Sequence, residues 1–299
     1  MSAPLDRVLE KLIGGDAKSL EGFGVVCANS RGPLIEPGIF KYGTRIEIAG
    51  DGRVRMTVVR SLSDRPGGES GVYEIRKDKA FVFRVAELLK SCRLDEIPAQ
   101  PASPMGAIIN ISVVAGGTAA DYLFASSDAG ATKFLKPLLN EIVTLSDELE
   151  RSPIMTLGVD LIAPTHARTG NVRFAASLDL HNSGTQGYWL THPSRLTAEH
   201  EGCELIYGKK PEVTQETMPE PLVTQRAPLT APDGSHPDLL WMAPSGRARV
   251  ELAAQVEYAS SGNYFMRAGY ACYSGGMTFG GQPHFVGAAF STDIEVIVS

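Results

Sequence analysis

The chain has 299 residues, of which 43% are hydrophobic and 21% are charged, and its formal net charge is −6. This length suits two domains of about 150 residues each, and the composition excludes disordered and fibrous proteins. The mild negative charge argues against nucleic-acid binding, because phosphate recognition needs a basic surface. No run of about 18 consecutive apolar residues occurs, so we expect no membrane span.

The first half of the chain predicts helices that cover hairpins. Apolar residues between Leu5 and Ile13 follow helical spacing, and the same spacing predicts helices over about 80–92 and 132–149. A hairpin is expected to turn at Gly116-Gly117. Strands segregated from covering helices predict a two-layer α+β domain over residues 1–150.

Residues 41–60 predict another hairpin whose register follows from the sequence. A three-residue loop, Gly50-Asp51-Gly52, pairs Ile48 with Val54 and keeps apolar and charged side chains on separate faces. A two-residue turn would mix them. We therefore predict the three-residue loop, with Gly52 in the left-handed backbone conformation.

From residue 153 onward, strand-like alternation dominates the sequence. Arg247 to Tyr258, for example, alternates polar with apolar side chains, as a half-buried antiparallel strand requires. The predicted strands are 154–162, 171–181, 187–191, 203–207, 238–242, 248–258, 263–273 and 292–298. This pattern predicts an antiparallel β-sandwich over residues 153–299, and therefore an α+β chain with two domains.

The segments Gly170–Phe174, Leu180–Gly184 and Gly262–Tyr270 together resemble a bacterial immunoglobulin-like sandwich. In such domains a strand ends in an Asn-x-Gly turn, and a Tyr near the start of a late strand ties down a corner. The resemblance covers only the C-terminal half and implies an immunoglobulin-like fold there. The paired cysteines and strand-C tryptophan of antibody domains are missing, so the resemblance concerns architecture.

The four cysteines are expected to be buried thiols. They are Cys27, Cys92, Cys203 and Cys272, and no two form a C-x-x-C pair. Free cysteine is among the most buried residue types, and unpaired thiols suit a reducing compartment. The first fifteen residues carry charged side chains and lack the apolar core of a signal peptide. We therefore expect a cytoplasmic protein.

Motifs for catalysis, cofactors and metals are absent or incomplete. The sequence lacks the G-x-S-x-G elbow, the phosphate-binding loop, H-E-x-x-H and a complete G-x-G-x-x-G. The densest metal-like group is His200 to Glu204, which His192 or His284 could complete, but neighbouring side chains of a strand face opposite ways. We predict no metal, no cofactor and no catalytic residue. Candidates for a hydrolytic triad of nucleophile, base and orienting acid can be proposed, namely Ser245, Ser274, His284 and Asp293.

Two long connections between predicted strands indicate a role in binding a partner. Residues 209–238 contain six prolines, and such long connections are usually functional or disordered. Residues 273–285 join two strands at one end of the predicted sandwich, where binding loops cluster. The predicted binding residues of this segment are Tyr273, Met277, Phe279, His284 and Phe285. By contrast, Trp241 lies among apolar neighbours, and we expect it to pack in the core.

These features predict a non-catalytic, cytoplasmic binding protein that acts through a protein partner. One concrete version is a bacterial inhibitor or immunity-type protein that inserts a loop into a toxin or an enzyme. Two alternatives stay open. One is a hydrolase whose site lies between the two domains, and the other is a small-molecule or carbohydrate-binding module that stacks its ligand on Tyr188, Trp189 or Phe279.

Overall fold

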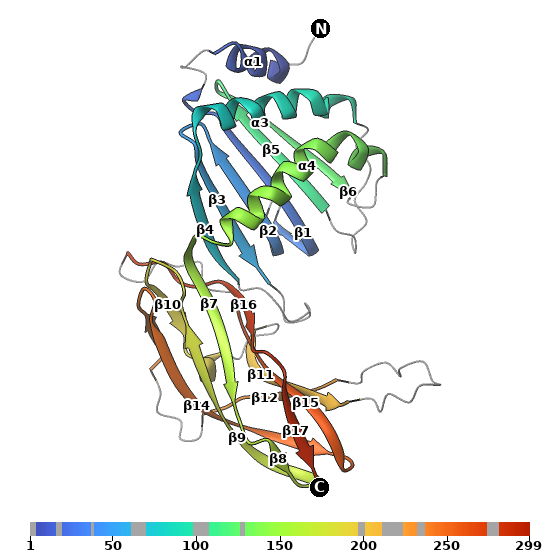
Figure 1. The fold of residues 1–299 in the computed structure, drawn as a ribbon, viewed down its shortest axis with the longest axis vertical. Coiled ribbons are helices and arrows are strands. Elements are labelled where there is room, and N and C mark those ends of the chain that lie inside the picture. Colours follow the sequence, from blue (N-terminus) through green and yellow to red (C-terminus); the bar gives the residue numbers. More distant parts are fainter. Residues whose placement is uncertain are drawn as a thin grey trace. The chain divides into compact units, whose positions relative to one another are not determined.

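A computed structural model shows two compact units (Figure 1). Unit 1 comprises Met1–Val59 and Val72–Ile154, and unit 2 comprises Arg60–Gly71 and Met155–Ser299. The residues that the structure describes are 4–15, 20–36, 39–60, 70–97, 108–125, 129–196, 201–210, 224–231, 237–273 and 281–299.

Unit 1 is built on an antiparallel sheet. Its strands are β1 (Gly24–Glu36), β2 (Ile39–Ala49), β3 (Arg53–Val59), β4 (Ser70–Arg76), β5 (Ile108–Ala115) and β6 (Thr118–Ala125). They follow the order β4-β3-β2-β1-β5-β6, and the pairs from β3 to β6 are antiparallel. Strand β6 is the last strand of this order.

Helices α1 (Pro4–Ile13), α3 (Lys79–Cys92) and α4 (Ala129–Leu149) complete unit 1. Figure 1 shows α3 and α4 running across one face of the sheet. Leu12, Val85 and Leu138 of these helices are fully buried in the same apolar cluster as Ile111 of β5. Helix α3 begins where the Asp78 side chain accepts a hydrogen bond from the backbone N–H of Phe81 at 2.9 Å, which is an N-cap.

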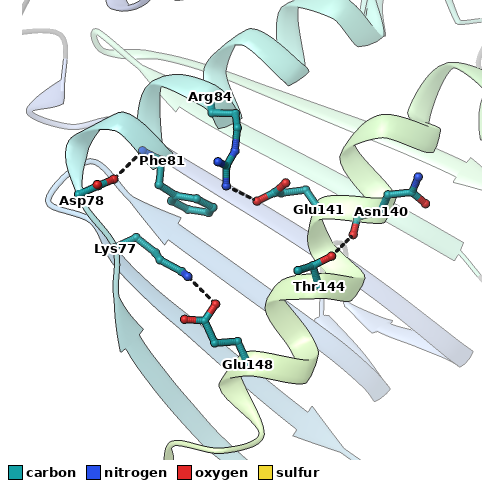
Figure 2. A network of polar contacts seen from close by, with 8 residues as sticks. All are labelled: Lys77, Asp78, Phe81, Arg84, Asn140, Glu141, Thr144 and Glu148. Carbon is teal, nitrogen blue, oxygen red and sulfur yellow. Dashed lines mark hydrogen bonds and ion pairs between the residues drawn. The ribbon is translucent and has the colours of Figure 1, made fainter.

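Polar contacts join α3, and Lys77 just before it, to α4 (Figure 2). Arg84 pairs with Glu141 at 2.7 Å, and Lys77 pairs with Glu148. The ring of Phe81 lies between the two cations, 5.7 Å from Lys77 Nζ and 5.3 Å from Arg84 Cζ. Because these side chains remain partly exposed to solvent, each ion pair contributes about 1 kcal/mol or less. Apolar burial, rather than this network, holds the two helices together.

The predicted hairpin of residues 41–60 is confirmed. Ile48 lies opposite Val54, and the loop between β2 and β3 has three residues. Gly52 has a φ of +84°, the left-handed conformation that the sequence required. The register that separates the two faces is therefore the one that forms.

The predicted α+β class, with a two-layer N-terminal domain of hairpins, is wrong. Strands make up 55% of the described residues and helices 20%, in large antiparallel sheets. The main omission is β1, for which no strand was predicted. Its pairing with β2 continues past Gly32-Pro33, with register shifts between Arg31 and Leu34 and again by Glu36. Within the described part of the chain, β1 pairs with β5 from Gly24 to Ser30.

The described strands of unit 2 fall into three sets of paired strands. They are β7 (Pro153–Ile162), β8 (His166–Ala167), β9 (Gly170–His181), β10 (Tyr188–Thr191), β11 (Gly202–Lys209), β12 (Gln225–Pro228), β13 (Leu239–Met242), β14 (Arg247–Tyr258), β15 (Gly262–Cys272), β16 (Gly287–Phe290) and β17 (Ile294–Val298). One sheet runs β14-β9-β7, another runs β12-β11-β15-β17-β8 with β16 beside β15, and β10 pairs with β13. Strand β12 lies inside the predicted connection 209–238, which is therefore partly ordered as sheet.

The two larger sheets share one apolar core. Leu178 of β9 and Val250 of β14 belong to the same buried cluster as Leu205 of β11 and Met266 of β15. Because both sheets contribute inward-facing side chains to one interior, unit 2 is a β-sandwich. The Tyr264 hydroxyl donates to the carbonyl of Ser260 at 3.0 Å, four residues upstream, as the predicted corner requires.

The outer face of β9 and β14 carries a charged pair that gives a pH prediction. Arg249 donates two hydrogen bonds to Asp179, at 2.6 and 2.8 Å, and this contact lowers the pKa of the Asp179 carboxyl. A carboxyl whose pKa is lower in the folded than in the unfolded state stabilises the fold. This contribution is complete at pH values above the unfolded-state pKa of about 3.9, and it is lost as the pH falls through the folded-state pKa.

We expect Arg249→Gln to raise the pKa of Asp179 toward its ordinary value in an NMR titration. The stability difference between the variant and the natural protein should then disappear at pH values below the folded pKa. Arg173→Gln, on the same strand face, is the control and should leave the Asp179 titration unchanged. An unchanged Asp179 titration in Arg249→Gln would contradict the assignment.

Candidate functional site

The small sheet of unit 2 places two tryptophans opposite each other. Trp189 of β10 pairs with Trp241 of β13, and their ring centroids lie 5.1 Å apart at an interplanar angle of 61°. This edge-to-face arrangement is a preferred aromatic geometry. Trp241 nevertheless keeps 42% of its surface exposed. The pair therefore presents a large apolar ring to solvent.

Gly187 provides the space that the Trp241 ring occupies. A Cβ atom at this position would lie 2.5 Å from Cζ2 of Trp241, so the ring lies directly over the glycine backbone. Between this backbone and Trp189, the ring is held on two sides. Its exposed orientation is therefore fixed by the fold, and little side-chain entropy remains to be lost when a partner covers it.

The inner side of the small sheet is anchored in the core of unit 2. Tyr188 is fully buried, and its hydroxyl donates to the carbonyl of Thr156 at 2.7 Å. The ring of Phe285, also fully buried, lies 5.6 Å from that of Tyr188 and 6.4 Å from that of Tyr270. The Tyr270 hydroxyl donates to the carbonyl of Thr191 at 3.0 Å. The small sheet is thus a rigid support for its outer face.

His284 joins this sheet through a segment that runs beside β10. The backbone N–H of Trp189 donates to Pro283 at 2.9 Å, and that of Phe285 donates to Trp189 at 2.8 Å. His284 Nδ1 lies 3.0 Å from the carbonyl oxygen of Phe285, and Nε2 lies 3.2 Å from Thr191 Oγ1. Because a carbonyl only accepts, Nδ1 carries the proton and Nε2 accepts from the threonine hydroxyl. His284 is therefore held in one tautomer next to the tryptophan pair.

The structure distributes the predicted binding residues unevenly. His284 lies beside Trp189, whereas Phe285 is fully buried and supports the sheet from below. The backbone N–H of Tyr273 donates to Glu201 Oε1 at 2.6 Å, and its hydroxyl donates to the carbonyl of Arg60 at 3.0 Å. Two further predicted residues, Met277 and Phe279, lie outside the described residues.

The prediction that Trp241 packs in the core is wrong, because its side chain is 42% exposed. Met242, the next residue, is 1% exposed, so the two side chains point to opposite faces of β13. The period-2 alternation of a strand was therefore the available signal, and the apolar neighbours of Trp241 obscured it.

The proposed hydrolytic set is not assembled in the described part of the chain. Both ring nitrogens of His284 face Thr191 and Phe285, and Asp293 pairs with Arg267 at 3.8 Å. The backbone N–H of Ser245 donates to Gly184 at 3.1 Å, and Ser274 lies outside the described residues. Within the described part of the chain, these residues therefore do not form a catalytic triad of nucleophile, base and orienting acid.

The metal-like group of residues 200–204 is also dispersed. Glu204 pairs with Arg226 at 2.6 Å, while Cys203 is buried on the other face of β11. Burial raises the pKa of Cys203, so its thiol stays protonated. His200 lies outside the described residues, and among the described ones no group of three His, Cys, Asp or Glu side chains could hold a metal ion.

The described helices include none that is both long and apolar enough to span a membrane. The sequence matches no protein-family model, and it matches no curated protein. Among solved structures, the chain is similar to the CARDB domain of a protein from Pyrococcus furiosus, determined by solution NMR, with 12% identity and a TM-score of 0.22. The match covers 48% of this chain and 95% of that chain.

Proposed function

We propose that the protein is non-catalytic and acts by binding a protein partner through the outer face of its small sheet. This tryptophan surface consists of Trp241, Trp189 and His284. The observation that carries the proposal is the exposed Trp241 ring, fixed over Gly187 and against Trp189. Tryptophan is enriched among the residues that dominate protein interfaces, and a rigid aromatic anchor binds at low entropic cost.

The surroundings of the tryptophan surface suit a protein interface. Asp238 immediately precedes β13, and its carboxylate pairs with Arg195 at 3.0 Å while both side chains remain well exposed. An apolar centre with a charged pair at its border has the anatomy of a binding patch with a polar rim. The rigid support below, through Tyr188 and Phe285, allows the patch to bind without reorganisation.

More specifically, we propose an immunoglobulin-like sandwich that works in the cytoplasm as an inhibitor or immunity-type protein. The corner hydrogen bond of Tyr264 supports the immunoglobulin-like assignment. All four cysteines are free and buried, which supports a reducing compartment.

The test compares the partners retained by the immobilised full-length protein from a lysate of its native host. We expect a protein retained at stoichiometric yield by the natural chain, and a loss of affinity of about thirtyfold or more in Trp241→Ala. Ile297→Ala is the matched control, because Ile297 is also an exposed apolar residue of unit 2, at 48%. It should bind like the natural protein.

Two outcomes would contradict the proposal. Equal retention by Trp241→Ala and by the control would show that the tryptophan surface is not the interface. An increase in melting temperature with glycans, lost in Trp241→Ala and without any retained protein, would instead support the carbohydrate-binding alternative.

A further inference from the structure

The face of the unit 1 sheet opposite the helices contains a hollow over β1, β2 and β3. Val25, Ile48 and Val54 of these strands belong to the buried cluster that the helices share. Side chains alternate along a strand, so the residues next to them lie on the opposite face. The hollow has a volume of about 130 Å³. The residues of that face that line this arginine hollow are Gly24, Val26, Glu47, Ala49, Arg53 and Arg55.

Small residues form the floor of the arginine hollow. Gly24 of β1 lies opposite Ala49 of β2, so neither strand places a long side chain there. A Cβ atom at position 24 would come no closer than 4.0 Å to the nearest atom, the carbonyl oxygen of Ile48, so the space above the glycine is open. The volume lies well below the roughly 300–1,000 Å³ of sites for drug-sized ligands. The arginine hollow therefore suits a small chemical group.

Two guanidinium groups border the arginine hollow without an ion-pair partner among the described residues. Arg53 and Arg55 are exposed and share one face of β3, because they are two residues apart. Glu47 lies directly opposite Arg55, but its carboxylate pairs with Arg45 at 2.8 Å. Asp51, in the turn before β3, accepts a hydrogen bond from the backbone N–H of Arg53 at 3.0 Å. Both nearby carboxylates are thus engaged elsewhere, and the two guanidinium groups are available to an anion.

We propose that the arginine hollow binds the phosphate group of a small phosphate monoester. Such a phosphate carries about 1.5 to 2 negative charges at pH 7 and has three acceptor oxygens, which match the charges and the N–H donors of two guanidinium groups. A carboxylate carries one charge and would leave the second guanidinium unmatched. The carbon side of the ester would contact Val26 and Ala49 on the floor of the hollow.

The positive charge stops at the arginine hollow, which argues against a nucleic-acid strand as the ligand. Across the same face, Val26 lies opposite Ser112 of β5, and Ser112 lies opposite Asp121 of β6. Asp121 is exposed and acidic. A nucleic-acid strand requires a basic stripe that follows several phosphates. A single phosphate group is therefore the anion that fits this face.

Titration of the ¹⁵N-labelled full chain with inorganic phosphate, ethyl phosphate and acetate, at constant ionic strength, tests the ligand. We expect saturable NMR shifts of the backbone amides of Gly24, Val26 and Arg55. The affinity should be millimolar, because solvent and salt screen exposed guanidinium groups. Ethyl phosphate should bind at least as tightly as inorganic phosphate, and acetate about fivefold more weakly than either. Shifts that do not saturate, or equal affinities for acetate and phosphate, would overturn the proposal.

Three variants separate the shape of the arginine hollow from its charge. Arg55→Gln should weaken the binding of ethyl phosphate about fivefold, whereas Glu47→Gln should strengthen it by removing a negative charge. Ala49→Leu fills the floor and keeps both guanidinium groups, and it should weaken binding about fivefold or more. Arg173→Gln, which changes an exposed arginine of unit 2, is the control and should bind like the natural chain.

Thermal denaturation of each variant verifies that it is folded before its affinity is compared. Ala49→Leu binding as tightly as the natural chain would show that the hollow plays no part. An equal loss in Arg55→Gln and Arg173→Gln would show that only the overall charge of the chain matters. Either result would overturn the proposal. Neither result depends on the tryptophan surface, because that surface belongs to unit 2.

Discussion

Replacing Gly52 by alanine is expected to lower the free energy of unfolding by about 3 kcal/mol. Gly52 has a φ of +84°, which costs any residue with a Cβ atom about 1–2 kcal/mol. In addition, the new Cβ would lie 2.1 Å from the backbone oxygen of Lys77. That backbone is held close because the N–H of Lys77 donates to the carbonyl of Gly52 at 2.8 Å. Neither group can move without breaking the contact between the hairpin and the start of α3.

Gly117→Ala is the matched control for this prediction. Gly117 has a φ of +77°, but no atom lies within 4 Å of the position that its Cβ would take. The control should therefore lose only the conformational contribution, about 1 kcal/mol, in urea denaturation followed by circular dichroism. Equal losses in the two variants would show that the close approach to Lys77 does not exist in solution.

Replacing Phe285 by alanine should cost about 3–5 kcal/mol of unfolding free energy. The side chain is fully buried, and its ring packs against Tyr188 and Tyr270. Its removal leaves a cavity beneath the small sheet. The backbone of Phe285 also bonds to Trp189, so the tryptophan surface should lose its rigid support together with the stability.

Trp241→Ala separates binding from stability at the same sheet. Because Trp241 is 42% exposed, its truncation should cost less than that of the fully buried Phe285, although the edge-to-face contact with Trp189 adds about 0.5–1.5 kcal/mol to the area that the ring buries. Thermal and urea denaturation of the two variants measure the difference. A loss in Trp241→Ala as large as that in Phe285→Ala would mean that Trp241 is a core residue, as its sequence neighbours suggested.

Local sequence patterns predicted the elements whose shape depends on neighbouring residues. The loop Gly50-Asp51-Gly52 determined the β2–β3 register, and apolar spacing located α3 to within a residue of its observed start. Helix α4 begins at Ala129, earlier than predicted, and includes Pro137, which the rule for helix interiors would exclude. No strand was predicted over Gly24–Glu36, where β1 lies. Its continuation depends on pairing with β2, which is tertiary information.

The candidate site was harder to predict than the sandwich that carries it. Trp189 and Trp241 meet only because β10 pairs with β13, and these strands are distant in the chain. The space over Gly187 also depends on that pairing. The sequence did single out His284, because its segment connects strands at an end of the sandwich. It could not distinguish His284, on the outer face, from Phe285, which is buried.

Hydrogen–deuterium exchange of the full chain, alone and with the retained partner, tests the central claim most directly. If the tryptophan surface is the interface, exchange slows on binding in peptides that contain β10, β13 and residues 281–285, and it stays unchanged in α3 and α4. Slowing that is confined to unit 1, with β10 and β13 unaffected, would contradict the assignment of the tryptophan surface as the site of partner binding.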